Sequence, residues 1–175
     1  MKLIVAPLHE VAGLVAVHHP SHLIRLASPG HVDAPLADAP PYRLDLRFND
    51  IAEQREGLTP PSEVDVAALL AFAEGWDGAR PLLICCWAGV SRSTAAAYAV
   101  ACAHSEPGRE QDWAERLRQA APTATPNPLI VALADSYLNR RGAMSRAVAA
   151  IKRGAETDWG AAFELDLSPQ GTSHS

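Results

Sequence analysis

A cysteine and an arginine with five residues between them, Cys86 and Arg92, bracket a stretch that could do chemistry on a phosphate group. The stretch CWAGVSRS follows a wholly apolar run and precedes an alanine-rich segment, so we expect a buried strand, a loop and a helix. Such a loop presents backbone N–H groups and the positive end of a helix, which together hold a tetrahedral anion. Arg92 adds a planar fork that binds two phosphate oxygens at once. The spacing therefore predicts an oxyanion site.

The same surroundings predict a reactive thiol at Cys86. A helix end and an arginine favour the thiolate over the thiol, and a thiolate beneath a bound phosphate is placed for in-line attack on phosphorus. The alternatives are an inert core thiol and an arginine in a surface ion pair. Trp87 either borders the mouth of the pocket or packs beneath the loop. The residues expected to bind the substrate are Trp87, Ala88, Gly89, Val90, Ser91 and Arg92, with Gly89 letting the backbone approach the anion.

The segment from Cys86 to Ser93 resembles the signature loop of the cysteine-dependent protein tyrosine phosphatases, and its AGVSRS core looks most like the dual-specificity branch. The segments LRFND and PNPLI are also similar to dual-specificity positions, so the likeness extends over residues 1–150. The resemblance implies a central, mostly parallel four-stranded sheet flanked by helices. It also implies a two-step reaction through a cysteinyl-phosphate, with no metal and no other cofactor.

Carried over residue by residue, the resemblance gives four catalytic residues. Cys86 is the nucleophile and Arg92 holds the phosphate, while the hydroxyl of Ser93 eases departure of the thiolate in the second step. Asp50 matches the general acid, an aspartate on a loop that follows a strand upstream of the nucleophile. A carboxyl on such a loop can deliver the proton that a phenolate or alkoxide leaving group needs.

Two other carboxylates are candidates for the same acid, and Asp50 has a second interpretation. An aspartate at a strand end is often a turn residue that caps the backbone. Glu53 lies three residues further on, and Asp45 lies within the preceding strand. Because Asp45 alternates with apolar neighbours, we expect its side chain to point away from the site.

Cys85 occupies the position that is usually histidine in the family. That histidine helps to order the loop and to ionise the nucleophile, so its replacement implies a lower activity or one shifted to higher pH. Cys85 is interpreted as a packing residue. A redox role, in which Cys85 or Cys102 captures oxidised Cys86, is the alternative hypothesis.

The elements that must position this loop are read from the hydrophobic periodicity. Strands alternate with helices, which favours a mostly parallel α/β sheet covered on both faces. Strands are expected at residues 2–6, 22–27, 43–48 and 81–85, and helices at 8–17, from the Ser62 cap to about 76, and at 93–104, 111–121, 128–138 and 144–151. Residues 28–41 and 49–61 read as loops. We expect one domain over residues 1–153 and a partly disordered tail over 154–175.

Composition excludes several classes of protein. A chain of 175 residues with a net charge of −5 lacks the basic surplus of a dedicated nucleic-acid binder. No apolar run is long enough to cross a membrane, and the histidines show no metal-ligand spacing. Three closely spaced cysteines favour a reducing cytoplasm over a secreted disulfide framework. Thirteen arginines against two lysines, with abundant alanine, suggest a GC-rich bacterial genome.

The sequence therefore predicts a phosphatase that acts on a phosphorylated protein or a small phosphomonoester. Phosphate-like oxyanions are expected to bind the loop. Residues 87, 88, 90 and 91 add no cation, which disfavours phosphoinositides. One alternative is a catalytically silent phosphoprotein-recognition domain. Another is rhodanese-type sulfur transfer, whose chemistry does not require the Ser93 hydroxyl or Asp50.

Overall fold

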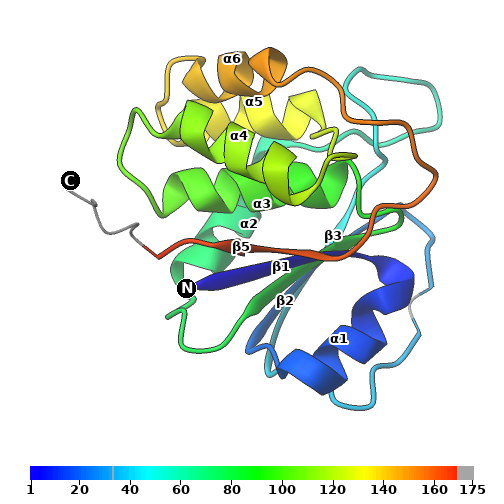
Figure 1. The fold of residues 1–175 in the computed structure, drawn as a ribbon. Helices are drawn as coiled ribbons and strands as arrows, with labels where there is room; N and C mark the ends of the chain where they lie inside the picture. Colours follow the sequence, from blue (N-terminus) through cyan, green and yellow to red (C-terminus); the bar gives the residue numbers. More distant parts are fainter. Residues whose placement is uncertain (33, 169–175) are drawn as a thin grey trace, which may run out of the picture.

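The computed structural model describes residues 1–32 and 34–168, which form a three-layer α/β arrangement (Figure 1). Each predicted strand and helix corresponds to an observed element, with bounds that differ by about two residues, except that residues 8–10 form a 3-10 turn instead of helix. The elements in chain order are β1 (Lys2–Pro7), η1 (Leu8–Glu10), α1 (Val11–His18), β2 (His22–Ala27), β3 (Tyr42–Arg47), α2 (Glu63–Glu74), β4 (Leu82–Cys86), α3 (Arg92–Ala103), α4 (Glu110–Ala120), α5 (Pro128–Tyr137), α6 (Ala143–Ala150) and β5 (Phe163–Asp166).

The sheet is mostly parallel, as predicted, but in the described residues it has five strands in the order β3-β2-β4-β1-β5. The pairs β1–β4, β2–β4 and β2–β3 are parallel, whereas β5 runs antiparallel to β1. The expectation of four strands was therefore wrong by one. The fifth strand lies in the stretch that the sequence predicted to be tail, and residues 169–175 of that stretch lie outside the described residues.

The two faces of the sheet are covered unequally (Figure 1). α1 lies on one face, over a small cluster that includes Ile4, Leu23 and Cys85. The other helices lie on the opposite face, where the larger core includes Leu3, Ile84 and Cys86. Because side chains alternate across a strand, the adjacent cysteines of β4 point to opposite faces.

α3 is the central helix of the larger layer. Its residues from Arg92 to Cys102 are all buried, and its alanines allow the sheet and neighbouring helices to approach closely. Its first turn, residues 92–94, is buried with the rest of the helix. That first turn follows the candidate phosphate loop directly.

Capping side chains fix where two other helices begin. Ser62 is the expected cap of α2, and with Asp65 it forms a capping box. The side chain of Asn127 accepts hydrogen bonds from two backbone N–H groups of α5, and Pro128 occupies the first position of that helix. None of the helices in the described part of the chain is long and apolar enough to span a membrane.

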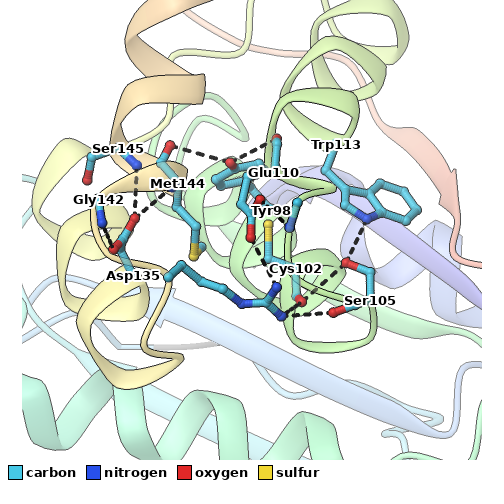
Figure 2. A network of polar contacts seen from close by, with 11 residues as sticks. Tyr98, Cys102, Ser105, Glu110, Trp113, Asp135, Gly142, Met144 and Ser145 are labelled. Atoms are coloured by element: carbon cyan, nitrogen blue, oxygen red, sulfur yellow. Dashed lines mark hydrogen bonds and ion pairs between the residues drawn. The ribbon is translucent and has the colours of Figure 1, made fainter.

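A buried polar network joins α3 to α4, α5 and α6 at the end of α3 far from the loop (Figure 2). Arg140 forms an ion pair with Glu110 at 3.0 Å, and both side chains are only 7% exposed. The guanidinium of Arg140 also donates to the carbonyl oxygens of Cys102 and Ser105 at 2.7 and 2.8 Å. Burial raises the pKa of the Cys102 thiol to about 12.

Candidate active site

A pocket of about 420 Å³ opens where the four parallel strands end. Ser28 lines it after β2, Asp50 after β3, and Cys86 at the end of β4. Parallel strands bring their carboxyl ends to one edge of a sheet, which is where α/β folds place their ligand sites. The pocket therefore gathers side chains from segments that are far apart in the sequence.

Cys86 lines this pocket and is 3% exposed. Its Sγ lies 3.1 Å from the Oγ of Ser93, which is fully buried in the first turn of α3. The predicted nucleophile and the predicted hydroxyl partner are therefore in hydrogen-bond contact. Either atom can donate.

Most carbonyl oxygens of the loop from residue 87 to residue 91 are occupied by hydrogen bonds to the rest of the protein. Each of four carbonyls accepts a hydrogen bond from the surrounding chain: Trp87 from the Leu8 amide (3.2 Å), Ala88 from Gly160 (2.8 Å), Val90 from Thr125 (2.9 Å) and Ser91 from Asn127 (3.3 Å). The amides of residues 88–91 donate no hydrogen bond to any described residue. A partly buried loop with bonded carbonyls and unbonded amides is suited to bind an anion.

Gly89 is required at the tip of this loop for two reasons. Its φ is +70°, a backbone conformation that residues with a side chain rarely adopt. A Cβ added at this position would lie 2.6 Å from the backbone nitrogen of Pro7. Gly89 itself does not line the pocket, whereas the other five predicted binding residues do. Its role is to let the loop curl against the end of β1.

Arg92 is 5% exposed and reaches across the pocket from the start of α3. Its Nη1 donates to the carbonyl of Phe48 at 2.9 Å and to the Oγ of Ser28 at 3.3 Å. Its Nε is buried and has no hydrogen-bond partner in the described residues. The guanidinium is thus anchored on one side and keeps an unbonded donor. Because Arg92 also lines the pocket, its side chain is suited to a second, anionic partner.

Asp50 lies at the pocket, beside the loop. Its Oδ1 accepts hydrogen bonds from the Oγ of Ser91 and the Nδ2 of Asn127, both at 2.8 Å. The two other candidate acids are elsewhere: Asp45 accepts hydrogen bonds from Arg25 and Arg43, and neither it nor Glu53 lines the pocket. Of the three carboxylates considered, only Asp50 is positioned to act on a group bound by the loop.

Neither of the two remaining cysteines lines the pocket. Cys85 is buried in the small cluster beneath α1, which agrees with a packing role. Cys102 lies ten residues beyond Arg92 on α3, about 15 Å along the helix axis. A disulfide needs Cα atoms within roughly 7 Å, so the position of Cys102 argues against a bond to Cys86.

Several site residues were not found by sequence reasoning. Asn127 bonds Asp50, Ser28 bonds Arg92, and Thr157 lines the pocket from the segment before β5. The segment PNPLI contained a signal for Asn127, since an asparagine before proline and an apolar run indicates a helix cap. Nothing local marks Ser28 or Thr157, because both reach the site through tertiary packing.

No cluster of three or more histidine, cysteine, aspartate or glutamate side chains in the described residues is arranged to hold a metal ion. The arrangement that is present consists of a buried thiol, a ring of amides, a guanidinium and one carboxylate. These groups can bind a tetrahedral oxyanion and place a sulfur atom next to its centre.

The sequence matches no protein-family model, and a search of curated proteins finds no match. Solved structures do resemble this chain. DUSP15 superposes with a TM-score of 0.59 at 18% identity, covering 89% of this chain and 94% of that one. The phosphatase domain of Yvh1 from Chaetomium thermophilum gives a TM-score of 0.54 at 18% identity, covering 81% and 93%. The fold is therefore that of the dual-specificity branch of cysteine-dependent tyrosine phosphatases.

Proposed function

We propose that this protein is a phosphatase that hydrolyses phosphate monoesters, either on phosphorylated proteins or on small molecules, through a cysteinyl-phosphate. The observation that carries this proposal is the loop after β4. Its amides at residues 88–91 and the Nε of Arg92 have no hydrogen-bond partner among the described residues, and they surround the buried Cys86. Such donors satisfy the oxygens of a bound phosphate and stabilise the charge that develops in the transition state. The likeness in fold to two phosphatases supports the same chemistry.

In the first step the thiolate of Cys86 attacks phosphorus and the bond to the ester oxygen breaks. The departing oxygen takes a proton from Asp50, whose carboxyl lies at the pocket. Ser91 and Asn127 hold that carboxyl beside the loop. The products of this step are the free alcohol or phenol and a phosphoryl group on sulfur.

In the second step a water molecule attacks the phosphoryl group and gives its proton to the Asp50 carboxylate. The sulfur–phosphorus bond breaks, and the electron pair returns to Cys86. The hydroxyl of Ser93, 3.1 Å from the sulfur, stabilises the departing thiolate by a hydrogen bond. Inorganic phosphate then leaves and the site is restored.

The experiment that tests the proposal measures turnover of an aryl phosphate and binding of inorganic phosphate on the same protein. Both are measured in strong reductant with a metal chelator. We expect metal-independent turnover and phosphate binding in the wild type. Arg92→Lys should lose roughly a hundredfold or more in kcat/KM and should bind phosphate more weakly, because a point charge cannot replace the planar fork.

The control is Arg109→Ala, which removes an exposed arginine outside the pocket and should change neither quantity. Phosphate binding without turnover would indicate a catalytically silent phosphate-recognition domain and not an enzyme. Absence of both would reject the proposal.

A bacterial cytoplasm remains the expected setting, on cysteine usage and composition alone. We likewise propose no nucleic-acid or membrane partner, because of the acidic net charge and the lack of long apolar runs.

A further inference from the structure

The chain between α6 and β5, residues 151–162, forms neither helix nor strand, yet it is bonded to the phosphate loop, residues 87–91. We call residues 151–162 the connecting segment. It passes the carboxyl ends of the parallel strands before β5 pairs with β1 (Figure 1). Thr157 of this segment lines the pocket. Part of the chain that the sequence predicted to be tail is therefore next to the site.

Gly160 bonds the connecting segment directly to the phosphate loop. Its amide donates to the carbonyl oxygen of Ala88 at 2.8 Å. The peptide that joins Ala88 to Gly89 is planar and trans, so its carbonyl and its N–H point in opposite directions. The bond from Gly160 therefore fixes the direction of the Gly89 amide. That amide is one of the four in the loop that have no hydrogen-bond partner among the described residues.

The same contact leaves no room for a side chain at position 160. Gly160 is buried, and an added Cβ would lie 2.9 Å from the carbonyl oxygen of Gly89 and 3.4 Å from that of Ala88. Both atoms belong to the backbone of the loop, so no side-chain rotation relieves the overlap. The φ of Gly160 is not positive, so alanine could adopt its conformation. Glycine is therefore required here because the loop is close, and not because of its own backbone angles.

The connecting segment is tied down on both sides of Gly160. Before it, the amide of Gly154 donates to Oγ1 of Thr125 at 3.1 Å, and the amide of Thr125 donates to the carbonyl of Val90 at 2.9 Å. After it, β5 is paired with β1 over its whole length. A displacement at position 160 therefore cannot be absorbed by the segment alone, and it is transmitted to the phosphate loop.

Building on the proposed phosphatase function, we propose that Gly160 is a positioning residue for the phosphate loop, and that the connecting segment and β5 together brace that loop. The brace acts through the backbone: it holds the Ala88 carbonyl and thereby directs the Gly89 amide. It contributes no group to the reaction itself. The working site then extends to a part of the chain that supplies none of the four catalytic residues.

The test is Gly160→Ala in the full-length protein, with the Kd of inorganic phosphate measured by calorimetric titration. The Kd should rise roughly tenfold, because an overpacked contact costs about 1–3 kcal/mol. The kcat/KM for aryl phosphates should fall by at least as much, since the loop amides also stabilise the transition state. This loss should be the same for phenyl and dinitrophenyl phosphate, because the loop contacts the phosphate oxygens and not the leaving group.

Two glycine variants serve as matched controls. Gly13→Ala adds a Cβ on α1 where nothing lies within 4 Å, and it should leave the Kd of phosphate unchanged. Gly142→Ala, in the turn before α6 and outside the pocket, forces a side chain onto a φ of +83°. It should lower the melting temperature and still bind phosphate as the wild type does.

A second variant loosens the brace without an overlap at the loop, for the case in which Gly160→Ala does not fold. Leu165→Ala shortens a buried side chain of β5, and Leu69→Ala does the same on α2, away from the brace. Both should cost about 2–5 kcal/mol of stability. Only Leu165→Ala should raise the Kd of phosphate, by about threefold.

A folded Gly160→Ala that binds phosphate as tightly as the wild type would overturn the proposal. Equal losses of phosphate affinity in Gly160→Ala and Gly142→Ala, or in Leu165→Ala and Leu69→Ala, would also overturn it, because they would reflect general stability. Failure of the proposed function appears in the wild type instead, as binding of phosphate without turnover, and the Kd comparison then still tests the brace. A wild type that binds no phosphate would reject both proposals.

Discussion

At the scale of single residues, the site depends on a side chain that does no chemistry itself. Asn127 caps α5 with its Oδ1 and holds Asp50 with its Nδ2. The carboxyl is therefore fixed relative to the loop by a helix cap that lies 77 residues later in the chain. Asn127 is a positioning residue, and its effect on the reaction should follow that of Asp50.

We predict that Asp50→Asn slows esters with poor leaving groups far more than activated ones. The reason is that only a poor leaving group needs a proton from the acid. Phenyl phosphate should lose roughly a hundredfold in kcat, and a dinitrophenyl ester less than about tenfold. The measurement is kcat over a series of aryl phosphates of graded leaving-group acidity.

Asn127→Ala should show the same dependence on leaving group, with a smaller loss. It should also unfold about 1 kcal/mol more easily because a helix cap is removed. Ser62→Ala is the matched control: it removes the cap of α2, which is outside the pocket. If the two cap variants showed the same leaving-group dependence, Asn127 would have no role in positioning the acid.

At the scale of elements, the unit that makes the site is β4, its loop and α3. Sequence reasoning could predict this unit because each part carries a local signal. The strand is an apolar run, the loop contains a glycine, and the helix is rich in alanine. It could not predict β5, since four residues with two apolar side chains resemble any loop until β1 provides the pairing partner. Thr157, which lines the pocket from the segment before β5, was missed for the same reason.

We predict that Gly89→Ala disrupts the loop, whereas Gly108→Ala does not. Both glycines have positive φ, but only at position 89 would a Cβ meet backbone atoms; at position 108 nothing lies within 4 Å. Gly89→Ala should weaken inorganic phosphate binding by roughly tenfold or more, and Gly108→Ala should cost only about 1 kcal/mol of stability. Calorimetric titration with phosphate and thermal unfolding measure the two effects. Unchanged phosphate affinity in Gly89→Ala would show that the loop tolerates a different path.

At the scale of the whole molecule, the buried network around Arg140 joins the helices far from the chemistry (Figure 2). The residues of this network come from four helices and the turns that link them. No local pattern in the sequence therefore predicts that Glu110 pairs with Arg140. Glu110 is buried although it stands in the first turn of a helix, and Arg140 is the partner that compensates its charge.

We predict that Arg140→Ala lowers the free energy of unfolding by about 3–5 kcal/mol, because it leaves Glu110 charged and unpaired in the interior. Asp112→Ala breaks an exposed ion pair with Arg109 and should cost less than about 1 kcal/mol. Urea unfolding of both variants checks the difference. Phosphate binding should survive in folded Arg140→Ala, and a loss of stability no larger than that of Asp112→Ala would contradict the account of this network.

The same network predicts a loss of stability at alkaline pH. Burial raises the pKa of Cys102 from 9.0 to about 12, so between these values the unfolded chain releases a proton that the folded chain keeps. The free energy of unfolding should therefore fall as pH rises above 9, by up to roughly 1.4 kcal/mol per pH unit from this group. Urea unfolding at pH 8.5, 9.5 and 10.5 should show a shallower fall in Cys102→Ala. Parallel curves would contradict this assignment.

The central claim is that the sulfur of Cys86 attacks phosphorus, and one measurement addresses it directly. Wild type and Cys86→Ser are mixed with an aryl phosphate, quenched in acid after a fraction of a turnover and after many, and assayed for released phenol and for phosphate on protein. We predict turnover in the wild type, a phosphoryl group on the peptide that contains Cys86, and neither in Cys86→Ser, with Cys102→Ala behaving as wild type. Undiminished turnover by Cys86→Ser would contradict the thiolate mechanism, whatever the fold resembles.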